Sequence, residues 1–200
     1  MKSINLKKKR KEKRILSHVY EQLNEDYFKP ILEKPVFQYY RDKSEREKTI
    51  WDVHPLKAYF YLNNFDRGYM GEDIVSEILT MKYGYIVNPR SSPGHDRTVW
   101  RSYNVQGYKT EIKSSIMIRV AWIFNHLAKK KDWDRLILFG LTLDWKLYIC
   151  FLTKEDFLTN IEYFRKQQGG EEADNDDYWL RGDEGIEIFA QPFVRNVKDW

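Results

Sequence analysis

Apolar residues recur at helical spacing in two segments of the chain. From Ile15 they continue at this spacing until Pro30, which predicts an amphipathic helix. The second segment, residues 68–84, ends at Gly84, a residue type that commonly terminates helices. The predicted buried face of this second helix consists of Met70, Ile74, Ile78 and Met81.

Other segments alternate between apolar and polar residues or are continuously apolar, as strands are. Strands are predicted at residues 85–87, 96–100, 108–116, 134–141, 146–152 and 185–189. The loop 101–107 contains Asn104 and Gly107, so it joins two of these strands as an antiparallel hairpin. Helices are predicted at residues 120–131 and 154–168, the latter opened by a capping box of Thr153 and Asp156. This order predicts an α/β (α+β) fold with a mixed central sheet flanked by helices on both sides.

The composition is that of one compact domain with appendages. The chain has 200 residues, of which 42% are hydrophobic and 32% charged, enough to bury a single core. We expect residues 1–67 to form a basic N-terminal arm and a helical segment. Residues 68–200 are expected to form the core, with a C-terminal helix and hairpin.

The N-terminal end carries most of the positive charge. Its first 14 residues hold eight basic side chains and one acid, although the net charge of the whole chain is only +4. Such a block binds DNA phosphates through counterion release, and we expect Lys7, Lys8, Lys9 and Arg10 to do so. A solvated tail or a localisation signal is an equal alternative for the block taken alone.

The cellular location is expected to be cytoplasmic. No apolar run has the length of a membrane helix, and the N-terminus lacks the apolar region of a secretory signal. The single cysteine, Cys150, lies in an apolar run and is expected to be a buried structural thiol.

A possible catalytic group surrounds the predicted hairpin. Asp96 is the first residue of its first predicted strand, and Glu111 and Lys113 alternate along its second strand. Since side chains alternate between the faces of a strand, Glu111 and Lys113 share one face while Ile112 points to the core. Two acids and one amine would thus converge at one edge of the sheet. The plainer alternative is an exposed strand face with a cross-strand ion pair to Asp96 or Arg97.

With Glu72 on the preceding helix, these residues resemble the PD-(D/E)XK nuclease superfamily, which has the restriction-endonuclease-like fold. The similarity covers roughly residues 68–152 and includes the helix, the hairpin and the elements after it. The chain departs from the motif in one place, because His95 rather than proline precedes Asp96.

The resemblance implies a Mg²⁺-dependent nuclease, with Mn²⁺ as a substitute cation. Asp96, Glu111 and the backbone carbonyl of Ile112 would hold the metal, and Lys113 would orient the attacking water and stabilise the phosphorus. Glu72 would support a second metal or bind the first through water. Glu77 on the same helix is its rival for this role.

Three functions fit these residues. The first is a sequence-specific type II restriction endonuclease that acts on double-stranded DNA as a homodimer, with Arg90, Arg97 and Arg101 contacting phosphates. The second is a structure-selective resolvase or repair nuclease with the same chemistry. The third is a non-catalytic nucleic-acid-binding protein in which the acidic pair is structural.

Overall fold

The computed structural model describes residues 20–22, 25–38, 59, 62–89, 95–116, 121–142, 146–166 and 177–200. The basic residues Lys7, Lys8, Lys9 and Arg10 lie outside this part of the chain, and so does Arg90. In the described part, no helix is long and apolar enough to span a membrane.

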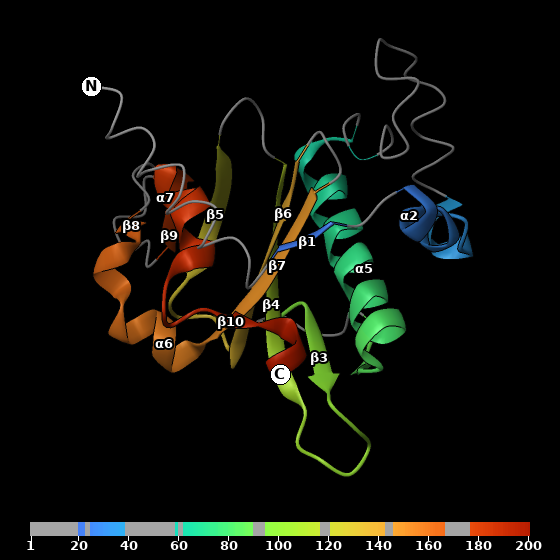
Figure 1. Ribbon diagram of the computed structural model, residues 1–200. Coiled ribbons are helices and arrows are strands. Elements are labelled where there is room, and N and C mark those ends of the chain that lie inside the picture. Colours follow the sequence, from blue (N-terminus) through green and yellow to red (C-terminus); the bar gives the residue numbers. More distant parts are fainter. Residues whose placement is uncertain are drawn as a thin grey trace.

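A mixed sheet of seven strands forms the centre of the fold (Figure 1). Its order is β1-β7-β6-β4-β3-β2, and β10 also pairs with β7. Strands β4 and β6 are parallel, and all other neighbours are antiparallel. The strands are β1 (Tyr20–Gln22), β2 (Ile86–Val87), β3 (Arg97–Trp100), β4 (Tyr108–Ile116), β6 (Arg135–Leu141), β7 (Lys146–Thr153) and β10 (Arg195–Asn196). The α+β class and the mixed central sheet are therefore as predicted.

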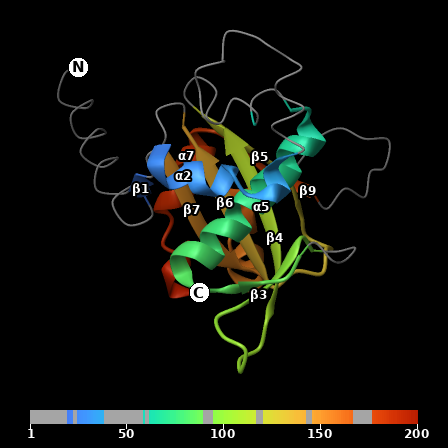
Figure 2. The same ribbon diagram turned by 90° about the vertical axis from the view of Figure 1, so that its right-hand side faces the viewer.

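One face of this sheet is covered by a helix and the other by a second sheet. Helix α5 (Asn64–Tyr83) packs on the first face, beside α2 (Glu25–Leu32) and the 3₁₀ turn η1 (Pro35–Phe37), as Figure 2 shows. On the opposite face lies a three-stranded antiparallel sheet of β5 (Trp122–Ala128), β9 (Asp177–Gly182) and β8 (Arg165–Lys166). The prediction of helices on both faces is therefore only partly correct, because this second sheet covers the second face and α6 (Lys154–Thr159) and α7 (Asp183–Glu187) lie on the same side.

The helix predicted at residues 120–131 is strand β5. Trp122, Phe124 and Leu127 are buried, whereas Ile123, Asn125 and His126 are exposed. The pairing of β5 with β9 shifts register between Phe124 and Leu127, which marks a β-bulge. The bulge adds one residue between the buried positions Phe124 and Leu127. Buried side chains therefore recur after two residues and then after three, and this spacing resembles that of an amphipathic helix.

Helix α5 forms where a helix was predicted, although it begins at Asn64 rather than near residue 68, and it is capped at both ends. The Asn63 side chain accepts a 3.0 Å hydrogen bond from the Asp66 backbone N–H, and Gly84 ends the helix in the left-handed region at φ 69°. The predicted inner positions Met70, Ile74 and Ile78 are buried, whereas Met81 in the last turn is 47% exposed.

Two hydrophobic cores lie on the two faces of the central sheet. The first packs α5 against β4, β6 and β7, and Ile112 belongs to it, as predicted. The second lies between the two sheets and contains the buried thiol Cys150. Alternate residues of β6 contribute to the two cores, because successive side chains of a strand point to opposite faces.

The C-terminal third differs from prediction in two segments. The capping box of Thr153 and Asp156 is present, but α6 is only Lys154–Thr159, and η2 (Ile161–Tyr163) and strand β8 follow it. Residues 185–189, predicted as a strand, form parts of helix α7 (Asp183–Glu187) and the turn η3 (Ile188–Ala190). The chain ends in η4 (Val197–Asp199).

A further difference lies near the N-terminus, where a helix was predicted from Ile15 to Pro30. Tyr20–Gln22 instead forms β1, which pairs with β7, and the helix α2 begins only at Glu25. Residues 15–19 lie outside the described part. Pairing to the edge of β7 satisfies backbone groups that a lone helix end would leave to solvent.

Candidate active site

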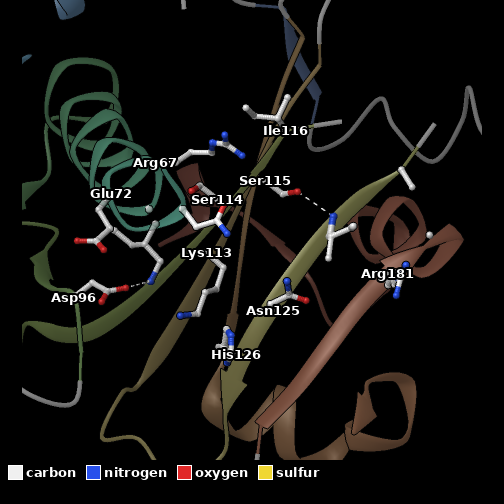
Figure 3. Close-up of a pocket in the computed structure, with 16 residues that line it drawn as sticks. Arg67, Glu72, Asp96, Lys113, Ser114, Ser115, Ile116, Asn125, His126 and Arg181 are labelled. Carbon is white, nitrogen blue, oxygen red and sulfur yellow. Dashed lines mark hydrogen bonds between the residues drawn. The ribbon is translucent and has the colours of Figure 1, made fainter. Parts of the chain in front are cut away.

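A cleft of about 580 Å³ opens between helix α5 and the second sheet, with strand β4 as its floor. Figure 3 shows the side chains that line it. Helix α5 contributes Asn64, Arg67 and Glu72, and β4 contributes Lys113, Ser114 and Ser115. The second sheet contributes Ile123, Asn125, His126 and Arg181. Asp96 lies at one end of the cleft. Two predicted catalytic side chains, Asp96 and Lys113, and the predicted helix carboxylate Glu72 therefore line one cleft.

Asp96 lies where strand β3 stops pairing with β4. The ladder of the two strands runs from Val99 opposite Tyr108 to Arg97 opposite Thr110, and beyond it β4 has an open edge. There the Asp96 carboxylate accepts a 2.7 Å hydrogen bond from the Ile112 backbone N–H, drawn in Figure 3. The Asp96 backbone N–H donates to the Thr110 carbonyl at 3.0 Å. The end of a short strand thus fixes this carboxylate beside the middle of β4.

The environment of Asp96 disfavours its negative charge. Burial raises the pKa of this carboxyl most strongly, and the negative charge of Glu111 raises it further. The Ile112 N–H and the ammonium groups of Lys113 and Lys131 oppose this shift, but the pKa remains above its ordinary value. Two carboxylates close enough to repel each other are a frequent arrangement at cation sites.

Glu111 is the most deeply buried member of the group, with 1% of its side chain exposed. Its Oε1 atom forms an ion pair with Lys113 Nζ at 2.6 Å and accepts a hydrogen bond from Lys131 Nζ at 2.9 Å. Its Oε2 atom is buried and has no hydrogen-bond partner among the described residues. Such an orphaned acceptor costs free energy unless a cation or a donor satisfies it.

Lys131 is a site residue that the sequence interpretation missed. It lies just after β5, in a run of three lysines that was taken for the end of a helix. Partial burial acts to lower the pKa of Lys131, but the hydrogen bond and the attraction to Glu111 outweigh it and hold the pKa above its ordinary value. Its contact with Glu111 spans 20 residues of sequence, so the lysine run was the only available signal.

The structure corrects the prediction for Arg97, because this residue lies in the protein interior. Only 2% of it is exposed. Its guanidinium donates to Glu72 at 3.1 Å, to Asp73 at 2.7 Å, to Ser76 Oγ at 3.1 Å and to the Asp96 carbonyl at 2.8 Å. The predicted phosphate contact by Arg97 is therefore wrong, since this cation joins helix α5 to the start of β3.

The structure also separates the two candidate helix carboxylates. Glu72 lines the cleft, where Arg97 neutralises its charge. Glu77 lies farther along α5 and pairs with Lys34. Glu72 is thus the carboxylate of α5 that reaches the site, although its guanidinium partner makes it a poorer cation ligand than Asp96 or Glu111.

Arg101 remains an exposed residue of the loop between β3 and β4. This loop extends beyond the rest of the sheet (Figure 1), at the far end of β3 from Asp96. It offers a surface cation, but not one that lines the cleft.

The wall opposite α5 carries polar side chains, two of which lie in the segment 120–131 that was predicted to be a helix. Asn125 and His126 lie at the bulge of β5 and line the cleft with Arg181 of β9. His126 has a positive φ of 55°, which is unusual for a residue with a side chain and is concentrated at functional sites. Its Nδ1 atom lies 3.1 Å from an Asp177 carboxylate oxygen.

The residues present fit a hydrated divalent cation rather than a fully protein-enclosed one. Among the described side chains, no three or more of His, Cys, Asp and Glu gather as a metal centre. Mg²⁺, however, usually takes one or two carboxylates and keeps several waters. Asp96 and Glu111, with the orphaned Oε2 atom, provide that donor set. The backbone of Ile112 between them is held by Asp96.

Comparisons of this chain with protein-family models, with curated proteins and with solved structures found no match.

Proposed function

We propose that this protein is a Mg²⁺-dependent DNA endonuclease that hydrolyses phosphodiester bonds in the cleft between α5 and the second sheet. One observation carries the proposal. Asp96, just before β3, and Lys113 of β4 line that cleft. Asp96 is hydrogen-bonded to the backbone of Ile112, and Lys113 forms an ion pair with the neighbouring buried Glu111.

The chemistry of phosphodiester hydrolysis needs these residue types. Asp96 and Glu111 would hold the cation, with the Ile112 carbonyl as a further ligand. When bound, the cation supplies positive charge for the phosphoryl oxygens and a water of lowered pKa. Lys113 is held by Glu111 at 2.6 Å, so its ammonium is positioned to orient a water or to stabilise negative charge on the phosphoryl group.

The charges along the cleft suit a polyanionic substrate. Acidic groups gather at the end that contains Asp96 and Glu72, whereas Arg67, Lys113 and Arg181 supply positive charge along its length. A phosphate chain would lie along the cationic part, with one phosphate beside the carboxylates.

The specific form that we propose is a type II restriction endonuclease acting as a homodimer on double-stranded DNA. Cutting both strands of a palindromic site requires two-fold symmetry, and a second copy of this chain would supply the second cleft. The N-terminal lysines and Arg10 would add phosphate contacts whose strength falls with salt.

The test is plasmid cleavage in millimolar Mg²⁺ by the wild type, Asp96→Asn and Lys113→Met. Matched controls are Asp132→Asn and Lys129→Met, which make the same chemical changes at exposed positions. We expect discrete fragments from the wild type and both controls, and none from the two site variants, with all five proteins folded by circular dichroism. Cleavage only of branched substrates would replace the restriction role with a structure-selective one. DNA binding without cleavage in every protein would refute the nuclease.

A further inference from the structure

Two ammonium groups share a single oxygen of Glu111. Lys113 approaches Oε1 along the same strand, and Lys131 approaches it from the segment after β5. The site expected from the sequence contains only Lys113, so Lys131 is a second cation beside Glu111.

Hydrogen bonds to the backbone carbonyl of Lys131 fix the position of this residue. Its carbonyl accepts a hydrogen bond from Lys154 Nζ at 2.8 Å and another from the Trp133 backbone N–H at 3.1 Å. Lys154 also lies over the Trp133 ring at 4.0 Å. Helix α6 thus holds the segment that delivers Lys131 to Glu111, while 42% of the Lys131 side chain remains exposed.

We propose that Lys131 is a resident counterion of Glu111 that competes with the divalent cation and so weakens cation binding to the DNA-free protein. The inference rests on the proposed function, since it assigns Glu111 as a cation ligand. A cation bound to Glu111 would lie within a few ångströms of the Lys131 ammonium, and like charges at that distance repel strongly where water is partly excluded.

Substrate would relieve this competition. A DNA phosphate bound beside Glu111 would offer the partly exposed Lys131 ammonium another anionic partner. Cation binding and DNA binding then strengthen each other, because a coupling between two ligands is reciprocal. The free protein would remain largely cation-free, and the site would load when DNA is present.

The test measures Mn²⁺ binding to the DNA-free protein by electron paramagnetic resonance, in which the signal of free Mn²⁺ falls as the ion binds. The variant is Lys131→Met, which removes the charge but keeps an apolar stem of similar length. The matched control is Lys129→Met, the same change at an exposed lysine two residues away. We expect Mn²⁺ to bind at least about fivefold more tightly to Lys131→Met than to the wild type, with Lys129→Met close to the wild type.

The outcomes separate the inference from the function beneath it. Equal Mn²⁺ affinity in the wild type and Lys131→Met, with binding lost in Asp96→Asn, would overturn the inference and leave the nuclease proposal standing. An equal gain in Lys129→Met and Lys131→Met would also overturn it, because the effect would then be one of net charge. An absence of Mn²⁺ binding in Lys131→Met would also overturn the inference, because removal of the competing ammonium would then fail to load the DNA-free site.

Discussion

Replacing Arg97 with methionine tests whether the network around this buried cation holds the site together. The guanidinium makes four hydrogen bonds, to Glu72, Asp73, Ser76 and the Asp96 carbonyl. Methionine fills much of the same space but donates none of these bonds. The variant therefore deprives two partly buried carboxylates of this cation and releases the backbone of Asp96.

The expected cost follows from the burial of the partners. Breaking a buried ion pair by removing one partner costs about 3–5 kcal/mol. The side chains of Glu72 and Asp73 retain 11% and 17% exposure, so water rehydrates them in part and the lower end applies, about 3 kcal/mol. A domain of this size loses about 2–4 °C of melting temperature per kcal/mol, which predicts a decrease of roughly 6–12 °C.

Thermal and urea unfolding of a double-mutant cycle would measure this cost. Glu72→Gln should be milder than Arg97→Met, and the double variant should recover part of the loss, since it removes one of the carboxylates that lost its cation. Lys109→Met, which removes the cation of an exposed ion pair with Asp132, should change stability little. A loss below about 1 kcal/mol in Arg97→Met, or a double variant no more stable than Arg97→Met, would refute the role of the network.

Three further predictions concern packing, ionisation and capping. Gly71→Ala should destabilise the protein by about 1–3 kcal/mol in urea unfolding, because its methyl carbon would lie 2.3 Å from Ser114 Oγ; an unchanged midpoint would contradict this close approach. Asp96→Asn, measured in EDTA, should be more stable than the wild type near neutral pH, since burial and then Glu111 raise the pKa of Asp96. The ionised carboxylate costs stability above that raised pKa, so the difference should shrink as the pH falls through it, and a difference that grows in acid would reverse the sign. Thr153→Ala removes the capping box of α6 and should cost about 1 kcal/mol in thermal unfolding, with Thr80→Ala as the control at an exposed helical threonine.

The elements that the sequence predicted well are those with local signals. Helix α5 has apolar residues at helical spacing and a terminal Gly84, and both strands of the hairpin alternate around an obvious loop. The alternation of side chains along β4 was also enough to predict that Ile112 points to the opposite face of the sheet from Glu111 and Lys113. Asp96, Glu111 and Lys113 of the proposed site lie on or beside these local elements, so the sequence pattern was sufficient to predict them.

The errors arise where tertiary contacts override the local pattern. The bulge at Asn125 and His126 gave β5 a helical spacing. Residues 185–189 alternate like a strand, yet Gly185 packs so closely on Trp122 that an added Cβ would lie 2.4 Å from the Trp122 carbonyl oxygen. The burial of Arg97 could have been predicted from the sequence. Arg97 lies two residues before the apolar Val99 in the same strand, so both side chains point to the interior face of the sheet.

The bulged strand β5 lies opposite α5, so the proposed catalytic residues and the facing wall of the cleft belong to different parts of the fold. Asp96, Glu111 and Lys113 depend on the hairpin of β3 and β4, whose strands are neighbours in the sequence. The facing wall depends on β5 and β9, which meet only in the folded protein and bring Asn125, His126 and Arg181 to the cleft. Changes to the hairpin should therefore abolish the proposed chemistry whatever the substrate, whereas changes to the facing wall should alter which DNA is bound while the carboxylate pair stays intact. Lys131 connects the two parts, because it follows β5 in sequence and contacts Glu111 on β4.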